Sequence, residues 1–457
     1  MFNNIYKRKD EQKSKSIETF SESYKLFLSK AKTERQTVNE IEKLALKNGF
    51  KKIDEFSKIS KWDKVYFLNK GKNIALYIIG EEITNGLKIT CSHVDSPRLD
   101  LKQKPLYESN EFAMLDTHYY GGIKKYQMVT TPLALHGVVF KRDGSMLNID
   151  IGDEEDDPIF GITDLLIHLS NEQMQKPVEK AIEGENLDVI VGSIPLWTEE
   201  KDSVKANFAK LLNDKFDIKE EDLISAEIEV VPAGKPKDFG LDRSMIAGYG
   251  QDDKCCVYST MKALFEIKEP TYTCCAIFTD KEETGDSGAT SAESVFFENS
   301  IIALLEKQGK NKLSDLRNTL QNSYMISCDV IAAVDPIYSY VSDYRNCAKF
   351  NCGVAIEKYL GYGGKYGTND ASPEFLAKLR NVLENRIHFQ TAEIGKVDLG
   401  GGGTLSRIFS KYNMEVIDCG IPMLNMHSPM EIIAKADLYE TFLFCKLFYE
   451  IFEICNN

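Results

Sequence analysis

The sequence lacks the segments that mark membrane-spanning and exported proteins. No uncharged apolar run reaches the roughly 18–20 residues that a transmembrane helix needs. Residues 1–16 are rich in lysine and contain no apolar stretch of the kind found in a signal peptide. The 457 residues, 43% hydrophobic and 28% charged, are otherwise of ordinary globular composition and long enough for two or three domains. We therefore expect a cytoplasmic protein with no membrane partner.

Basic residues are fewer than acidic ones. The chain has 56 Lys and Arg against 70 Asp and Glu, which gives a formal net charge of −14. A surface this acidic repels the phosphate backbone of nucleic acids. We therefore expect no nucleic-acid partner.

Signals for disulfides are missing as well. The chain has eleven cysteines but no C-x-x-C pair, and six of them lie in apolar runs, as buried free thiols do: Cys91, Cys255, Cys256, Cys274, Cys275 and Cys328. Adjacent pairs such as Cys255 and Cys256 point in diverging directions on a helix or strand. We interpret these residues as core packing rather than as a thiolate metal site.

The order of the expected elements indicates a discontinuous α/β domain with a β-rich insert. Residues 1–97 contain amphipathic helices and short β-branched strands, expected at 17–31, 37–49, 74–79 and 87–90. From residue 98 to 242, strand-like stretches alternate with acidic turns and one helical stretch, 163–172.

Residues 243–457 return to a strand–helix–strand rhythm. Helices are expected at 253–267 and 289–306, and strands at 272–278, 325–334 and 414–419. This alternation predicts an α/β layer around a central, mostly parallel sheet. Together with residues 1–97, this part of the chain forms one expected discontinuous domain.

Five short motifs place imidazole or carboxylate groups beside these elements. They are S-H-V-D-S-P with His93 and Asp95, G-Q-D-D-K with Asp252 and Asp253, T-D-K-E-E-T-G with Glu282 and Glu283, S-C-D-V with Asp329, and M-H-S-P with His427. Several of them follow a strand, and ligands of parallel sheets bind where the strands end at their carboxyl edge.

Taken singly, the first two motifs also have a structural interpretation. The Asp95 carboxylate can hold one N–H of His93 and so direct the other ring nitrogen to a metal, but a structural histidine would have the same neighbours. Asp252 and Asp253 precede a predicted helix, where they could act as N-caps.

The acidic motifs further along the chain also allow more than one interpretation. Glu282 and Glu283 would diverge in an extended loop, so that one could bind a cation while the other faces a substrate, or both could be solvated. Asp329 lies in an otherwise apolar strand. A buried carboxylate there needs a cation, a hydrogen-bond network or a metal.

In chain order the motifs run His, Asp, Glu-Glu, Asp, His, the ligand order of the co-catalytic dizinc exopeptidases. The sequence resembles the family of aspartyl aminopeptidases and aminopeptidase I over nearly its whole length. The resemblance rests on K-T-E-R at 32–35, H-V-D-S-P at 93–97, Y-Y-G-G-I at 119–123, D-K-E-E-T-G at 280–285, Asp329, G-G-G-G-T at 400–404 and M-H-S at 426–428. The Q-D-D sequence around Asp252 is more similar to that of the bacterial members of the family.

The resemblance implies two zinc ions per subunit. Its ligand pairs are His93 with Asp329 and Glu283 with His427. Asp252, which falls at the family's bridging aspartate, would hold both ions. Nitrogen and oxygen donors suit Zn²⁺, and Co²⁺ or Mn²⁺ can occupy a similar site.

Two cations that share a water lower its pKa and polarise a peptide carbonyl. Glu282 would then be the base that takes the proton of the water and passes it to the leaving amine. Asp95 completes the expected catalytic pair as the residue that orients His93.

The resemblance also implies an assembly. Residues 1–97 and 243–457 would form the catalytic metallopeptidase domain. The insert at 98–242 would dimerise, and the dimers would form a tetrahedral dodecamer with enclosed active sites. In this family a histidine from the insert of a neighbouring subunit completes the substrate pocket, and His168 matches it. Lys365 would border the pocket as a partner for an acidic side chain. Gly402 would lie in a loop that faces the substrate.

We therefore predict a metalloaminopeptidase that removes an acidic or neutral N-terminal residue from short peptides. The alternative from the same chemistry is a dinuclear-metal amidohydrolase that acts on another small amide. A non-catalytic protein with this fold is disfavoured, because such proteins lose ligands and here every ligand and the base are present.

Overall fold

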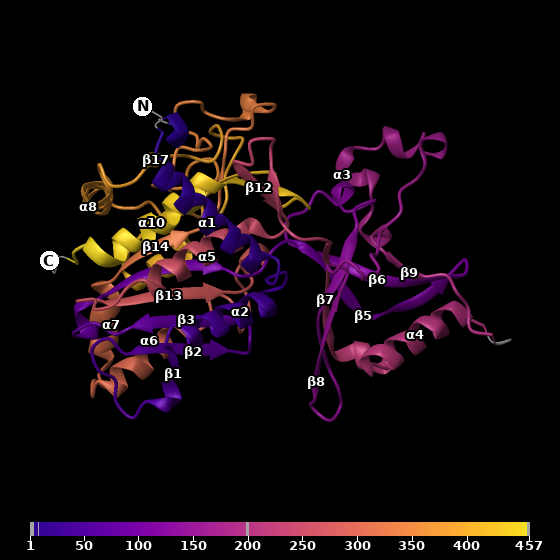
Figure 1. Ribbon diagram of the computed structural model, residues 1–457, viewed down its shortest axis with the longest axis horizontal. Helices are drawn as coiled ribbons and strands as arrows, with labels where there is room; N and C mark the ends of the chain where they lie inside the picture. Colours follow the sequence, from indigo (N-terminus) through magenta and orange to yellow (C-terminus); the bar gives the residue numbers. More distant parts are fainter. Residues whose placement is uncertain (1–3, 8, 198–200, 455–457) are drawn as a thin grey trace. The chain divides into compact units, whose positions relative to one another are not determined.

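The chain divides into two units, which are described separately below (Figure 1). The computed structural model describes residues 4–7, 9–197 and 201–454. Unit 1 comprises Met1–Asp95, Pro236–Met426 and Glu431–Asn457, and unit 2 comprises Ser96–Lys235 and His427–Met430. Among the described residues, no helix combines the length and apolar character required to cross a membrane.

Unit 1 is built on a nine-stranded sheet. In spatial order its strands are β1 (Lys51–Lys52), β2 (Lys64–Asn69), β3 (Asn73–Ile78), β13 (Thr273–Thr279), β4 (Leu87–His93), β14 (Tyr324–Cys328), β18 (Glu415–Gly420), β16 (Val354–Glu357) and β17 (Phe389–Thr391). The four central strands, β13 to β18 in this order, run parallel. The neighbours β3 and β16 run antiparallel to them. The predicted α/β class with a parallel centre is confirmed.

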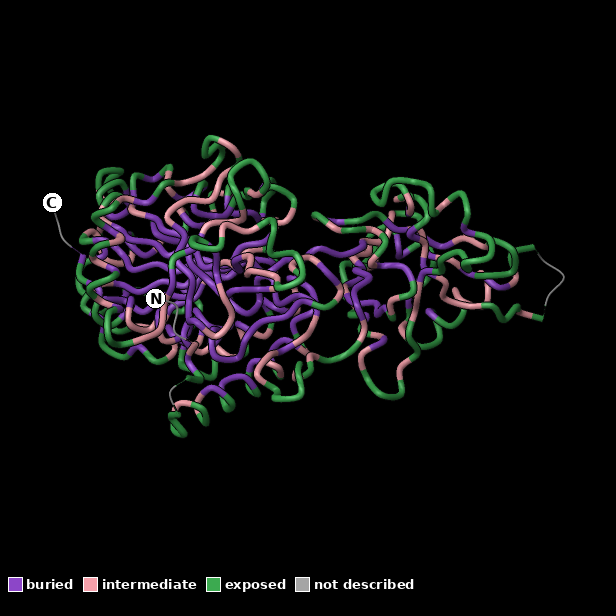
Figure 2. The backbone as a smooth tube through the Cα atoms, turned by 90° about the horizontal axis from the view of Figure 1, so that it is seen from above, coloured by how far each residue is buried: buried purple, intermediate pink, exposed green. Residues whose placement is uncertain are grey.

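Helices cover both faces of this sheet, and the buried backbone fills the middle of the unit (Figure 2). One core contains residues of α1 (Glu11–Leu28), α2 (Glu34–Lys47), α5 (Gln251–Phe265), α8 (Pro373–Leu383) and α10 (Lys435–Ile451). The other contains residues of α6 (Phe296–Lys307), α7 (Leu313–Gln321) and α9 (Ser406–Phe409). Along β13, Cys274 and Phe278 enter the first core while Cys275 and Ile277 enter the second. Alternate residues face opposite sides of a strand, which is why β13 is apolar throughout.

Unit 1 also contains a five-stranded sheet, whose strands lie close in the chain to residues of the candidate site. In spatial order its strands are β11 (Lys237–Phe239), β12 (Met245–Gly248), β20 (Glu431–Ala434), β19 (Pro422–Leu424) and β15 (Ile331–Ala332). β12 comes shortly before Asp252, and β15 begins two residues after Asp329. The small sheet therefore fixes segments that carry two of the predicted ligands.

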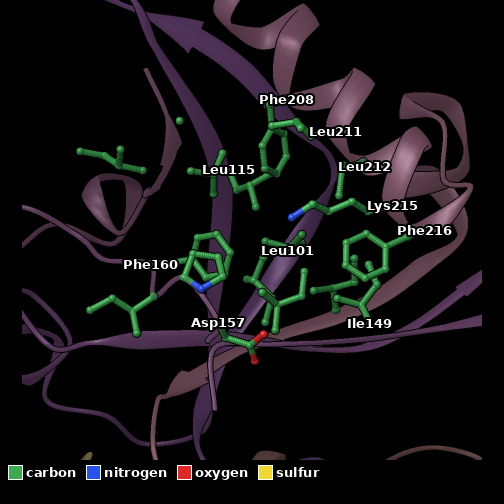
Figure 3. A pocket seen from close by; sticks show the side chains of 18 of the residues that line it. Leu101, Leu115, Ile149, Asp157, Phe160, Phe208, Leu211, Leu212, Lys215 and Phe216 are labelled. Atoms are coloured by element: carbon green, nitrogen blue, oxygen red, sulfur yellow. The ribbon is translucent and has the colours of Figure 1, made fainter. Parts of the chain in front are cut away.

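The described residues of unit 2 form one antiparallel sheet and one long helix. In spatial order the strands are β8 (Met146–Ile151), β7 (Leu133–Phe140), β10 (Ala226–Pro232), β5 (Arg98–Ser109), β6 (Phe112–Tyr120) and β9 (Val189–Gly192). The helices are α3 (Val178–Ala181) and α4 (Ser203–Phe216). A cavity of about 550 Å³ is lined by Leu101, Leu115 and Ile149 of the strands and by Phe208 and Leu212 of α4 (Figure 3).

Two of the expected helices differ from the structure. Residues 163–172 form only a short 3₁₀ turn, Ile167–Leu169, and both Leu166, which precedes it, and Leu169 are exposed. A helix this short is not stable unless one face packs against a core. The helix expected at 289–306 begins at Phe296, because the hydroxyls of Ser291 and Ser294 donate to backbone carbonyls and favour turns there.

His136 in β7 gives unit 2 a pH-dependent contribution to stability. Its Nδ1 lies 3.0 Å from Asp150 Oδ1 and its Nε2 lies 3.0 Å from Asp153 Oδ2. Burial lowers the pKa of His136, but the two hydrogen bonds outweigh this effect and raise it from its usual 6.5. Because the folded state binds the proton more tightly than the unfolded state, the contribution is complete below pH 6.5 and is lost as the pH rises through the folded-state pKa.

We expect the His136→Gln variant to lose this pH dependence. In the wild-type chain, hydrogen-exchange protection of the β7 and β10 amides should fall as the pH rises from about 6 to about 9, after correction for intrinsic exchange rates. In the variant it should change little over the same range. The exposed His118 provides the control, because His118→Gln should keep the wild-type profile. An unchanged profile in His136→Gln would contradict the assignment.

Candidate metal centre

The candidate centre of unit 1 lies where neighbouring parallel strands end. His93 is the last residue of β4 and pairs in register with Thr279, the last residue of β13. β14, on the other side of β4, ends one residue before Asp329. Because these strands run parallel, the side chains that follow them emerge at the same edge of the sheet.

His93 is at the centre of this group. Its Nε2 lies 3.1 Å from Asp252 Oδ1 and 3.6 Å from Asp329 Oδ1. Its Nδ1 lies 3.1 Å from the backbone oxygen of Asp95. Since a carbonyl oxygen only accepts hydrogen bonds, Nδ1 carries a proton, and Nε2 is the nitrogen that faces the two carboxylates.

Asp95 also holds the loop that carries the two glutamates. Its Oδ1 accepts the backbone N–H of Glu282 at 3.3 Å, and its Oδ2 accepts that of Glu283 at 3.2 Å. The Asp95 carboxylate lies 3.4 Å from His93 Nδ1, so its backbone oxygen is the closer partner of the ring. Asp95 therefore contacts the imidazole while its side chain fixes the neighbouring loop.

Two further carboxylates support the backbone of the centre. Asp253 Oδ2 accepts the backbone N–H of His93 at 3.3 Å, and Glu431 Oε2 accepts that of Asp252 at 3.1 Å. The Asp252–Asp253 peptide bond is cis, and both aspartates have non-helical backbone angles at the start of α5. Asp252 and Asp253 have different partners although they are adjacent in the chain.

These supporting residues were not predicted from the sequence. Glu431 begins β20, whose sequence E-I-I-A is otherwise apolar and which is buried throughout. The criterion that singled out Asp329, a carboxylate within an apolar strand, would also have found Glu431. Nothing in the sequence separates the role of Asp253 from that of its neighbour.

The pKa values of the centre reflect its concentration of buried carboxylates. Burial raises the pKa of Asp253 and of Glu282 well above their usual values, and neighbouring carboxylates raise both further. Burial also raises the pKa of Asp329, although the bond to His93 opposes it. For His93, burial lowers the pKa, but hydrogen bonds to Asp252, Asp329 and Asp95 outweigh it. The local negative charge thus favours a positive group beside His93 Nε2.

The donor set fits a divalent metal ion. Ligand atoms of His93, Asp252 and Asp329 lie within 4.8 Å of one another, as do those of His93, Glu282 and Glu283. Two ligand atoms on one tetrahedral Zn²⁺ are about 3.3 Å apart, close to the spacings around His93 Nε2. A cation would also offset the cost of burying several carboxylates together.

His427 is described with unit 2, in the four-residue stretch His427–Met430. Its Nδ1 lies 2.9 Å from the backbone oxygen of Gly122, so this nitrogen carries the proton in the neutral ring. Its Nε2 is therefore the nitrogen with a lone pair for a metal. His168, also in unit 2, is exposed within the Ile167–Leu169 turn.

Two loops of unit 1 carry the remaining predicted residues. Lys365 Nζ lies 2.9 Å from Asp370 Oδ2 and 3.5 Å from the ring centroid of Tyr359. The carbonyl of Gly402 accepts the N–H of Gly361 at 3.2 Å. The loop of Lys365 and the glycine-rich loop are therefore neighbours.

Known proteins share this architecture. The Aminopeptidase I zinc metalloprotease (M18) family profile matches residues 27–449. A probable M18 family aminopeptidase 1 from Clostridium acetobutylicum is 49% identical over 447 residues, 96% of each protein. The crystal structure of an M18 aminopeptidase from Thermotoga maritima superposes with a TM-score of 0.95 at 45% identity, covering 98% of this chain and 99% of that one. A structure described as the mApe1 dodecamer of S. cerevisiae, 18% identical, shares the fold with a TM-score of 0.76 and coverage of 95% and 97%.

We expect Asp329→Ala to weaken metal binding. Loss of a carboxylate 3.6 Å from His93 Nε2 should lower the affinity of the metal-free chain for Zn²⁺ about 100-fold, measured by competition with a chromophoric chelator. Glu306→Gln, which changes an exposed carboxylate on α6, is the matched control and should bind like the wild type. Equal affinities for Asp329→Ala and the control would exclude Asp329 as a ligand.

Proposed function

This chain belongs to the aminopeptidase I zinc metalloprotease family (M18), and we propose that it removes single residues from the free N-terminus of short peptides with two zinc ions. Zinc aminopeptidase activity is the function that the family assigns. The observation that carries the proposal is the position of His93 Nε2, which faces two buried carboxylates while its other nitrogen is fixed by Asp95.

We assign one zinc ion to His93 and Asp329, the other to Glu283 and His427, and the bridging position to Asp252. Asp252 is favoured over Asp253 because its Oδ1 lies 3.1 Å from His93 Nε2, whereas Asp253 accepts a backbone N–H. Co²⁺ or Mn²⁺ could replace zinc with the same donors.

The assignment of His427 rests on its place in the chain. Glu431, four residues further on, accepts the N–H of Asp252. Four residues span at most about 14 Å even when fully extended, so the chain limits how far His427 can lie from Glu431. Its proton on Nδ1 leaves Nε2 as the donor.

Bound in this way, the two ions would acidify a water molecule and polarise the scissile carbonyl. Glu282 would take the proton of the water and transfer it to the departing amine. Asp95 acts as a positioning residue, because it holds His93 and, through two backbone N–H groups, the loop of Glu282 and Glu283. The many carboxylates around the centre favour the positively charged N-terminus of a peptide.

Substrate preference would be set by the neighbouring loops. Lys365 is a candidate partner for an acidic N-terminal side chain, which would compete with Asp370 for its ammonium group. Neutral residues would bind without displacing this pair. Gly402 lies in a loop whose backbone can approach a peptide closely, since three of its neighbours are glycines.

We propose that unit 2 dimerises and that the dimers form a tetrahedral dodecamer in the cytoplasm. The apolar side chains of Leu165, Leu166, Ile167 and Leu169 are more than half exposed in the single chain, as expected of a subunit interface. The dodecamer described for S. cerevisiae mApe1 is consistent with this assembly. In it, His168 would reach the active site of a neighbouring subunit.

We expect Glu282→Gln to abolish turnover while retaining the metal. The amide keeps the size of the side chain but cannot accept a proton, so kcat should fall by about 10³-fold or more. Elemental analysis should show the wild-type zinc content, and Glu306→Gln should retain wild-type kcat. Activity within about tenfold of the wild type would rule out Glu282 as the base.

The requirement for a free amine separates an aminopeptidase from an amidohydrolase of other small amides. We expect the chain to cleave aminoacyl p-nitroanilides and to leave their N-acetylated forms intact, because acetylation removes the positive charge that the acidic site favours. The assay should include aspartyl, glutamyl, leucyl and alanyl substrates with added Zn²⁺, Co²⁺ or Mn²⁺. Equal cleavage of the acetylated series would favour the amidohydrolase.

A further inference from the structure

The cavity of unit 2 lies between α4 and the strands of the antiparallel sheet (Figure 3). Its volume of about 550 Å³ falls within the roughly 300–1,000 Å³ of sites that hold small organic molecules. Its floor includes the strand residues Leu115, Leu135, Ile149 and Ile228, which are each at most 4% exposed. The cavity therefore has the size and the lining of a binding site for an apolar molecule.

Several apolar residues that line the cavity are exposed and form its rim. Phe112 of β6 is 42% exposed, Ile159, which follows β8, is 60% exposed, and Leu211 of α4 is 45% exposed. Apolar side chains that remain exposed together are typical of a surface that binds a ligand or a partner. A ligand in the cavity would therefore cover apolar surface that the single chain leaves in contact with water.

One positive charge lies among these apolar side chains. Lys215, in the last turn of α4, is the only basic residue among the described residues that line the cavity. Figure 3 shows its side chain extending from α4 into the space among the labelled apolar side chains. The residue as a whole is exposed, so its ammonium group can remain hydrated while its methylene groups contact the lining. No described residue accepts a hydrogen bond from this ammonium group or forms an ion pair with it.

The acidic residues of the lining are engaged elsewhere or lie in solvent. Asp150 Oδ1 lies 3.0 Å from His136 Nδ1. Asp157 Oδ2 accepts two backbone N–H groups of its own loop, at 3.0 and 3.2 Å. Asp156 is exposed. Lys215 is thus the charged group of the lining that is left for a ligand.

We propose that this cavity binds one free aliphatic monocarboxylate, a medium-chain fatty acid such as decanoate. Its hydrocarbon chain would lie against the floor, where transfer from water to an apolar lining is favourable. Its carboxylate would pair with the Lys215 ammonium group at the rim, as oppositely charged hydrogen-bonding groups do. All lining residues belong to unit 2 and none is a residue of the candidate metal centre, so the proposal is independent of the proposed function.

The first test is isothermal titration calorimetry of the full-length protein with octanoate and decanoate, each below the concentration at which it forms micelles. We expect one molecule to bind per chain with a negative heat-capacity change, because apolar surface is buried. The affinity should rise about fourfold for each added methylene group. Absence of saturable binding, or equal affinities for the two acids, would overturn the proposal.

The second test separates the charge from the apolar lining. Lys215→Met keeps an unbranched apolar side chain but removes the ammonium group, so the affinity for decanoate should fall about fivefold. The affinity for decanol, which has no charge, should stay within about twofold of the wild type. Lys210→Met is the matched control, because Lys210 lies on the same helix, outside the lining, and pairs with Asp214. It should bind both compounds like the wild type.

An equal loss of decanoate affinity in Lys215→Met and Lys210→Met would exclude Lys215 as the partner of the carboxylate. A second copy of the chain is the competing occupant of the cavity. If the wild type binds no decanoate and the hydrogen-exchange protection of the α4 amides rises with protein concentration, the cavity is a subunit contact and the proposal is wrong. Binding is measured without a peptide substrate, so this proposal and the proposed peptidase activity can fail separately.

Discussion

The structure depends on confining several carboxylates around a single buried imidazole. Asp252 and Asp329 lie on one side of His93, and Asp95 lies on the other. In a region from which water is largely excluded, such groups repel one another and cannot all be ionised without a compensating cation. Burial raises the pKa values of Asp253, Asp329 and Glu282, and neighbouring carboxylates raise them further. A cation bound among these carboxylates would offset the cost of burying them together.

The fold keeps these groups together through backbone hydrogen bonds. Asp95, Asp253 and Glu431 each accept N–H groups from residues that face the centre. Such bonds to charged acceptors are stronger than neutral ones. The candidate base and one candidate ligand, Glu282 and Glu283, are fixed by the same carboxylate. Their relative position therefore depends on Asp95 as much as on their own loop.

The sequence was informative where local pattern and tertiary structure agree. The strands that end at His93 and before Asp329 are apolar and are covered on both faces, so their position and the edge at which they end could be predicted. The helix expected at 163–172 was wrong, because its apolar residues do not pack on a core within the chain. The carboxylate of Glu431 could have been noticed, because it lies in an otherwise apolar strand. That it accepts the backbone N–H of Asp252 depends on segments that meet only after folding, and a single sequence carries no signal for such long-range pairing.

The order of strands in the large sheet constrains how the chain is made. β4 lies between β13 and β14, which are translated about 180 and 230 residues later, roughly 10–45 s at ordinary elongation rates. During this interval both edges of β4 lack their final neighbours, and an uncovered apolar strand is prone to pair with other chains. Most of unit 2 is one continuous stretch, so it can fold on the ribosome before the C-terminal part of unit 1 has been synthesised. The topology therefore requires that β4 be protected from pairing with other chains while the rest of the protein is being synthesised.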